Sequence, residues 1–257
     1  MELPEIAGSS LLSFVLVLAR VGGLFVFAPL FSARMLPRPV KLAAAAALSL
    51  AITPLAVGPQ PLDVGGLEIA GLLLKEMAIG LALSFAIGAL SAAVQAAAGL
   101  LDAMIGFSLA AIVDPITNLQ NAILGQLYAV FTVMVLIVTG GDHLMIQGLA
   151  ASYRVVPLGE FPGFETIAGL AMQGFAGVFV MGLQIVAPVL IALVVVDAAF
   201  ALISRAVPQM NVLIVGLPAK IAVGFVVLGA SLPFVSTQLD TELREAVMAA
   251  LRGLGVP

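Results

Sequence analysis

Cysteine and tryptophan are absent from this 257-residue chain, and histidine occurs once, as His143. The chain therefore cannot form a disulfide, a thiolate metal site, a cysteine nucleophile or a site with several histidine ligands. Charge is also scarce, because only 9% of the residues are Asp, Glu, Lys or Arg. The 10 basic residues are scattered and the net charge is -4, which argues against nucleic acid as a partner.

The motifs of common catalytic sites are missing as well. The sequence has no HExxH zinc helix, no GxSxG nucleophile elbow and no glycine-rich phosphate loop that ends in Lys and Ser or Thr. His143 follows Asp142 at the end of an apolar run, where an interfacial polar contact is favoured over a general base. We therefore expect neither an enzyme nor a bound cofactor.

Apolar residues are abundant: 62% of the chain is hydrophobic and the mean hydropathy is +1.23. An average soluble domain has a much smaller apolar share. Several runs of about 20 apolar residues are long enough to cross the roughly 30 Å hydrocarbon core of a membrane. Hydropathy predicts six spans, at residues 10–30, 40–57, 67–100, 123–138, 170–203 and 212–235. The sequence thus predicts an all-α polytopic membrane protein of about six long apolar helices.

Two basic turns are expected to join these helices into hairpins. The first turn holds Arg34, Arg38 and Lys41, and the second holds Arg205 and Lys220. Because basic loops tend to stay in the cytoplasm, six spans would place both termini outside.

Other segments have weaker or interrupted apolar character. Residues 143–165 are interpreted as a semi-polar connection and residues 240–252 as a short amphipathic helix. Pro188 is expected to kink or break the span 170–203.

Small residues recur at every fourth position in the segment 67–100, at Ala78, Ala82, Ala86, Ala89, Ala93 and Ala97, with one shorter step between the two sets. Residues four apart share a helix face, and small residues there allow helices to approach closely. We expect this segment to pack against other helices, with an alanine-rich composition alone as the alternative.

Five charged residues fall inside apolar segments: Arg20, Lys75, Glu76, Asp102 and Asp197. A charge at membrane depth is costly unless it faces protein or water, so each is a candidate functional residue. Lys75 and Glu76 are adjacent and do not face each other on a helix. Pairing with charges on neighbouring helices or subunits is favoured, and a proton or ion relay is the alternative.

The segment 106–122, GFSLAAIVDPITNLQNA, interrupts a long apolar stretch. Asp114 and Pro115 would stop a helix at membrane depth, where irregular backbone is tolerated only if it is buried in protein or lines an aqueous cavity. A re-entrant pore constriction and a buried structural kink both satisfy that condition.

Five stretches in order resemble one known family: residues 19–54, 75–85 (KEMAIGLALSF), 106–115 (GFSLAAIVDP), 140–144 (GGDHL) and 204–221 (SRAVPQMNVLIVGLPAKI). Together they make the chain similar to the FliR/SctT family of the type III secretion export apparatus. Residues 207–220 also look like the turn of the small partner subunit FliQ. Ser84 stands where the family usually has glycine, which argues against very close helix contact there.

The resemblance implies one export-gate domain with a FliP-like portion, residues 1–165 including a re-entrant central loop 106–122, and a FliQ-like portion, residues 166–257. It implies a pore-forming subunit, assembled with FliP and FliQ, that exports unfolded flagellar proteins across the inner membrane. FlhB, FlhA and the MS ring of the basal body are the further implied partners, and the core of the gate would be raised above the membrane plane. A virulence injectisome subunit is the alternative, and a small secondary transporter is less favoured.

By the same resemblance, the family's plug maps onto 106–122, with Gly106, Phe107 and Ser108 at the constriction and Asp114 and Pro115 at its fixed bend. Gln209, Asn211 and Lys220 would lie at a cytoplasmic hairpin near FlhB. The pattern of Pro208, Gln209 and Asn211 favours the flagellar branch over the injectisome branch.

Overall fold

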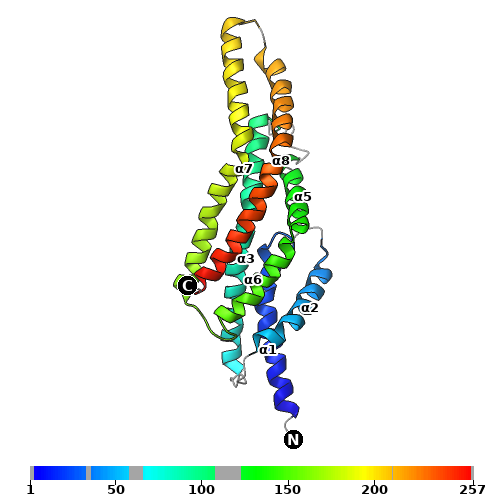
Figure 1. Cartoon of the computed structure of the whole chain (residues 1–257), viewed down its shortest axis with the longest axis vertical. Helices are drawn as coiled ribbons and strands as arrows, with labels where there is room; N and C mark the ends of the chain where they lie inside the picture. Colours follow the sequence, from blue (N-terminus) through cyan, green and yellow to red (C-terminus); the bar gives the residue numbers. More distant parts are fainter. Residues whose placement is uncertain (1–2, 33–35, 58–65, 108–122, 210, 256–257) are drawn as a thin grey trace. The chain divides into compact units, whose positions relative to one another are not determined.

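The structure is a computed structural model that describes residues 3–32, 36–57, 66–107, 123–209 and 211–255. Within these ranges the regular secondary structure is helical. The helices are α1 (Leu3–Phe27), α2 (Arg38–Ala56), α3 (Gly66–Ile105), α5 (Ile123–Val138), α6 (Gly141–Val155), α7 (Phe164–Ala206) and α8 (Val212–Gly253) (Figure 1).

The chain divides into two compact units. The first contains Met1–Leu90, Leu136–Ala176 and Glu242–Pro257, and the second contains Ser91–Val135 and Gly177–Thr241. Both units draw on residues before and after position 165, so the division into FliP-like and FliQ-like portions stays a prediction.

Four of the described helices, α2, α3, α7 and α8, are long and apolar enough to cross a membrane. The number rises to five if α5 and α6, which meet at a bend of 70°, form one broken span. The apolar stretch Leu11–Phe27 of α1 is shorter. The predicted all-α polytopic membrane fold is confirmed, whereas the count of six spans stays a prediction.

Several boundaries differ from those predicted. Residues 143–165 contain most of α6, which begins at Gly141, and residues 240–252 belong to the last part of α8 rather than to a separate helix. Pro188 lies inside α7, which continues on both sides of it. The basic turns are also shorter than predicted: Arg38 and Lys41 belong to α2 and Lys220 to α8. Proline is tolerated in the first turn of a helix, because the N–H that it lacks has no partner there, and α2 can therefore begin at Arg38 with a proline next to it.

In the first unit, α1 crosses α3 with its backbone in close contact. A Cβ atom on Gly80 would overlap the carbonyl oxygen of Arg20, and one on Gly88 would lie 2.6 Å from that of Phe27. Ser84, midway between these glycines, is buried, and its Oγ donates to the carbonyl oxygen of Leu81 in its own helix at 3.0 Å. The close contacts of α1 and α3 thus lie at the glycines on either side of Ser84, and the expectation about Ser84 itself stays a prediction.

Two alanines of α3, Ala86 and Ala93, lie against α7. A Cβ on Gly174 would lie 3.3 Å from Cα of Ala86, and, in the second unit, a Cβ on Gly182 would lie 3.2 Å from the carbonyl oxygen of Ala93. Ala82, Ala89, Ala93 and Ala97 are buried. These contacts agree with the expectation that the segment packs against other helices.

Helix α6 packs against the end of α8 in the first unit. A Cβ on Gly141 would lie 2.8 Å from Cδ2 of Leu243, and one on Gly148 would lie 2.7 Å from Cγ1 of Val247. Gly140, which separates α5 from α6, has a φ of 72°, a conformation that glycine adopts without steric cost. Helix α2 packs on α1 and also contacts α6.

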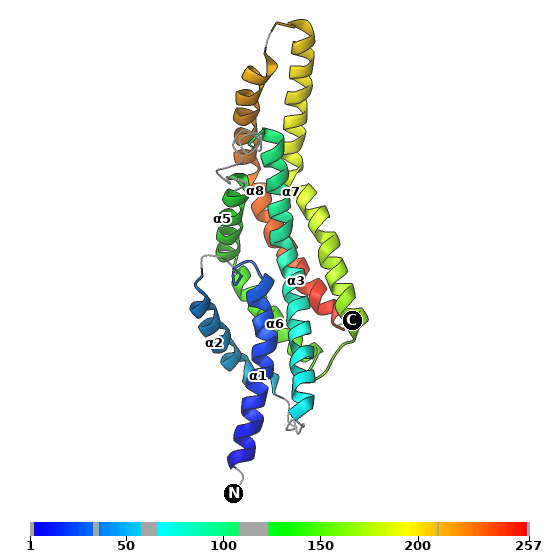
Figure 2. The same ribbon diagram turned by 180° about the vertical axis from the view of Figure 1, so that it is seen from behind.

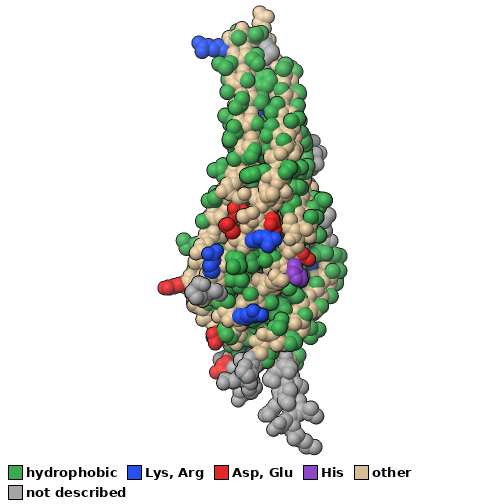
Figure 3. Space-filling view, viewed as in Figure 1, with side chains coloured by type: hydrophobic (Ala, Val, Ile, Leu, Met, Phe, Trp, Pro, Cys, Tyr) green, Lys and Arg blue, Asp and Glu red, His purple; other side chains and the backbone are tan. Residues whose placement is uncertain are grey.

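In the second unit, α7 and α8 run side by side as an antiparallel hairpin (Figure 1, Figure 2). Val186, Val189 and Leu193 of α7 and Leu228, Val235 and Leu239 of α8 are buried. Hydrophobic side chains also cover the visible outer face of the hairpin (Figure 3), and the large exposed ones include Phe179, Leu183, Ile191, Val195, Ile214 and Val226. The hairpin therefore presents an apolar surface outward as well as inward.

Candidate functional site: charges buried among apolar helices

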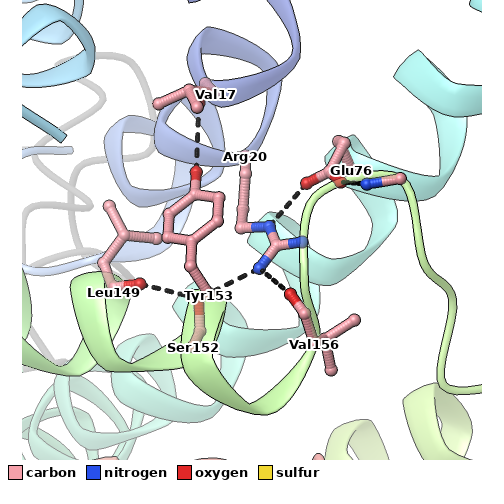
Figure 4. Close-up of polar contacts among 8 residues, drawn as sticks. Val17, Arg20, Glu76, Leu149, Ser152, Tyr153 and Val156 are labelled. Carbon is pink, nitrogen blue, oxygen red and sulfur yellow. Dashed lines mark hydrogen bonds and ion pairs between the residues drawn. The ribbon is translucent and has the colours of Figure 1, made fainter. Parts of the chain in front are cut away.

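The first charged cluster centres on Arg20, in the second half of α1. Its Nε donates to Oε2 of Glu76 on α3 at 2.6 Å, and neither side chain has any exposed surface (Figure 4). Its Nη1 donates to the carbonyl oxygen of Val156 at 3.0 Å and to Oγ of Ser152 at 3.3 Å. The guanidinium group thus joins α1 to α3 and to the end of α6.

Two further contacts complete the cluster. The Cζ of Arg20 lies 4.1 Å from the centre of the Tyr153 ring, within the range of a cation–π interaction. The second carboxylate oxygen of Glu76 accepts the backbone N–H of Gly159 at 2.9 Å, in the connection between α6 and α7. Because both oxygens of Glu76 are occupied and the side chain is sealed from solvent, the geometry favours a structural role over a proton relay.

Lys75 has no part in this cluster. Its side chain is exposed, whereas the neighbouring Glu76 is buried. This arrangement agrees with the expectation that the two adjacent residues do not face each other.

Asp102, near the end of α3, contacts the start of α5. Its Oδ1 accepts the N–H of Leu124 at 3.1 Å and its Oδ2 accepts the N–H of Gly125 at 3.4 Å. The first N–H groups of a helix have no partner within the helix, and the helix dipole favours a negative charge beside them. Among the described residues, the partner of Asp102 is therefore a helix N-terminus, and pairing with a charge on another subunit stays a prediction.

The end of α3 also carries two residues of the predicted constriction. Gly106 has a φ of 101°, and the N–H groups of Gly106 and Phe107 donate to the carbonyl oxygen of Asp102 at 3.2 and 3.0 Å. The Phe107 ring lies 6.0 Å from that of Phe225 on α8, edge to face. Ser108, Asp114 and Pro115 lie outside the described residues.

A third charged group crosses the hairpin of α7 and α8. The Nζ of Lys220 lies 2.8 Å from Oδ1 of Asp197, and the two side chains are 20% and 47% exposed. Gln238 of α8 donates to Gln184 of α7 at 3.1 Å in the same hairpin. Asp197 therefore has a charged partner within its own chain.

The other predicted turn residues lie at helix ends. Arg205 is in the last turn of α7, and Gln209 and Asn211 follow it, all three exposed. Arg38 is exposed at the start of α2, where Lys41 donates to the carbonyl oxygen of Ser32 at 2.9 Å. Arg34 lies outside the described residues.

Sequence reasoning missed the other members of this cluster, namely Ser152, Tyr153 and Val156 around Arg20 and Gly159 beside Glu76. They belong to α6 and to the segment after it, which we interpreted together as a semi-polar connection. The spacing of Met145, Leu149 and Tyr153, all buried on one face of α6, is the signal that could have found them. In the described part of the chain, no group of three or more acidic or histidine side chains could hold a metal ion.

Comparison with known proteins identifies the family of this chain. The family model described as "Bacterial export proteins, family 1" matches residues 11–246. The chain is 33% identical over 219 residues to flagellar biosynthetic protein FliR of Bacillus subtilis, a match that covers 84% of each chain. It is 27% identical over 220 residues to FliR of Escherichia coli, covering 85% of this chain and 84% of that relative.

A relative from another secretion system is also similar. Yop proteins translocation protein T of Yersinia pestis is 28% identical over 223 residues, which cover 85% of each chain. The family model covers most of the sequence, including both partners of the Arg20–Glu76 pair. The chain is therefore a multi-pass membrane protein that belongs to family 1 of the bacterial export proteins, the FliR/SctT family.

Proposed function

We propose that this chain is a core pore-forming subunit of the flagellar type III protein export gate, in the bacterial inner membrane at the flagellar basal body. The observation that carries the proposal is the 33% identity to a flagellar FliR protein over 84% of both chains. The candidate site supports it, because its buried charges join helices to one another. The subunit would shape and seal a conduit for unfolded flagellar proteins, while an ATPase and the proton motive force act through other components.

The length of the helices supports an assembly with other subunits. Helices α3, α7 and α8 have 40, 43 and 42 residues, and each extends about 60 Å along its axis. At the largest usual tilt of about 40°, roughly 40 Å of helix fills the hydrocarbon core. About 20 Å of each helix would then lie outside lipid, and exposed apolar side chains there need protein to cover them.

The partners that we propose for this surface are FliP and FliQ, in a gate whose core is raised above the membrane plane. FlhB and FlhA would contact the gate on its cytoplasmic side, and the MS ring would surround it. The apolar outer face of the α7–α8 hairpin, with Phe179 and Leu183 exposed, is the surface that this proposal would cover.

Residues 106–122 are proposed as the plug that seals the resting gate. Support comes from the described residues on either side of positions 108–122: the N–H groups of Gly106, Phe107 and Leu124 all donate to Asp102. Gly106 and Phe107 would contribute to the constriction, together with Ser108, Asp114 and Pro115.

Co-expression tests the assembly. We expect the chain to be recovered in a stoichiometric complex with FliP and FliQ and to be unstable when expressed without them. A chain that is stable alone and moves a small solute in proteoliposomes would instead be a secondary transporter. Failure to recover the complex from cells that express all three subunits would sink the proposal.

A deletion strain separates the flagellar function from its alternative. The 28% identity to a Yop translocation protein favours a virulence injectisome as the second candidate. We expect deletion of the gene to abolish swimming and to leave effector secretion intact. The reverse pattern would assign the chain to an injectisome.

A further inference from the structure

We propose that Asp102 is a positioning residue of the export gate, which holds the end of α3 against the start of α5. This inference rests on the proposed function, because it assigns a residue that fixes the two anchor points of the proposed plug. Asp102 accepts hydrogen bonds from backbone N–H groups at both anchor points. In this proposal it does not itself contact an exported protein.

Asp102 makes hydrogen bonds to residues on both sides of positions 108–122. Its backbone carbonyl oxygen accepts the N–H groups of Gly106 and Phe107, where the chain leaves α3. Its carboxylate accepts the N–H groups of Leu124 and Gly125, where the chain enters α5. One residue therefore makes hydrogen bonds to the last described residues before position 108 and to the first turn after position 122.

The surroundings of Asp102 make this contact selective for a carboxylate. The side chain is only 4% exposed, and a carboxylate buried among apolar helices needs donors to compensate the loss of water. Two N–H groups at a helix N-terminus supply hydrogen bonds and a favourable dipole. Separation of α3 from α5 would leave the carboxylate and both donors without these partners, so the contact resists separation.

Neighbouring apolar contacts hold the same junction from the side of α8. The Phe107 ring packs edge to face on Phe225, and Ile105 lies so close to α8 that a Cβ on Gly224 would be 2.8 Å from its Cδ1. Leu101, Ile105 and Leu124 are fully buried. This packing is expected to keep the helices folded when the carboxylate is changed, so that a variant can lose positioning without losing the fold.

Two substitutions divide the contribution of Asp102 into its parts. Asp102→Asn keeps one acceptor oxygen but loses the charge, and its amide group would face an N–H donor. Asp102→Ala removes both acceptors. Since a hydrogen bond to a charged group changes an equilibrium by about 10-fold or more, we expect the alanine variant to raise the resting ion leak roughly tenfold and the asparagine variant to raise it less.

The experiment uses the complex of this chain with FliP and FliQ, purified and reconstituted into proteoliposomes loaded with K⁺. The rate of K⁺ efflux is measured for the wild type, for the two Asp102 variants and for a chain that lacks residues 108–122. The matched control is Thr132→Val, because Thr132 is a buried polar residue of α5 whose Oγ1, among the described residues, bonds only to the carbonyl oxygen of Tyr128 in its own helix. We expect this control to leak no more than the wild type.

The outcomes separate the positioning role from the proposed function. If the deletion leaks while both Asp102 complexes assemble and stay tight, the positioning role is wrong and the plug remains. If the deletion complex stays tight, the sealing role is wrong and the positioning role falls with it. Failure of both Asp102 variants to assemble would show that Asp102 is needed for folding, which also overturns the proposal. A leak in Thr132→Val equal to that in Asp102→Ala would overturn it as well, because the loss of any buried polar group near this junction would then be enough to cause the leak.

Discussion

Arg20 and Glu76, 56 residues apart in the sequence, form a fully buried ion pair with Nε and Oε2 at 2.6 Å. Taking two charges out of water is costly, and the attraction between them offsets this cost only when the geometry is good and the remaining donors and acceptors are satisfied. Here Val156 and Gly159 supply additional hydrogen bonds from the backbone, whereas Nη2 of Arg20 is buried without a hydrogen-bond partner among the described residues. The pair therefore fixes which surfaces of α1, α3 and α6 meet, more than it adds net stability.

Removal of one member of the pair should be strongly destabilising. We expect Arg20→Met to cost about 3–5 kcal/mol, because the Glu76 carboxylate would stay buried without its cation. The measurement is the Tm and the yield of the complex with FliP and FliQ, purified in detergent.

Two further variants control that result. Lys75→Met also replaces a basic residue with methionine, at the position that precedes Glu76 in the sequence. The Lys75 side chain is exposed, and we expect this variant to leave the Tm unchanged. The double variant Arg20→Met with Glu76→Met should recover part of the loss, because no unpaired charge remains. An Arg20→Met complex as stable as the Lys75→Met complex would contradict the structural role of the pair.

The Tyr153 ring should contribute through its face and not through its hydroxyl. The hydroxyl lies 3.5 Å from the carbonyl oxygen of Val17, at the limit of a hydrogen bond, whereas the ring lies directly against the guanidinium. We expect Tyr153→Phe to be nearly neutral and Tyr153→Leu to lose up to about 2 kcal/mol more than the phenylalanine variant. Equal Tm values for the two complexes would show that the cation–π contact adds nothing.

The helical fold was predictable because its signals are local. Runs of about 20 apolar residues identify spans from the composition of single segments, and the described helices α2, α3, α7 and α8 follow four of them. Helix α6 escaped prediction because Asp142, His143, Gln147 and Arg154 make its 15 residues semi-polar. Its apolar face packs against Leu243 and Val247 of α8, which lie about 100 residues away in the sequence, so local sequence patterns do not reveal this contact.

The charged residues were predictable as a class but not as pairs. Burial cost alone identifies Arg20, Glu76 and Asp102 as residues that need partners. The choice of partner depends on the register between helices, and the register of α1 against α3 is set by the contact of Gly80 with the backbone of Arg20. The partner of Asp102 is the N-terminus of helix α5. Its backbone N–H groups are present in every helix, so no residue type in the sequence identifies them.

The Gly80 contact gives a direct test of that register. A Cβ there would overlap the carbonyl oxygen of Arg20, so Gly80→Ala should push α1 away from α3 and cost roughly 1–3 kcal/mol. In the same helix, a Cβ on Gly71 would meet nothing within 4 Å. Gly71→Ala should therefore be neutral, or stabilising by up to about 1 kcal/mol. The comparison is the Tm of the two complexes, and a Gly80→Ala complex as stable as the Gly71→Ala complex would rule out the close crossing.

The hairpin pair of Lys220 and Asp197 distinguishes a local ion pair from a general need for positive charge at the predicted cytoplasmic turn. Lys220→Glu would place two carboxylates where the structure has an ion pair with a closest N–O distance of 2.8 Å. We expect it to reduce export by a factor of about 2–5, which corresponds to the modest free energy of a partly exposed pair. The exchanged variant, Asp197→Lys with Lys220→Asp, restores opposite charges across the same two helices. Swimming in soft agar should recover in the exchanged variant if the pair is what matters, and should stay impaired if the position of the positive charge on α8 is what matters. Normal swimming with Lys220→Glu alone would remove both residues from the functional site.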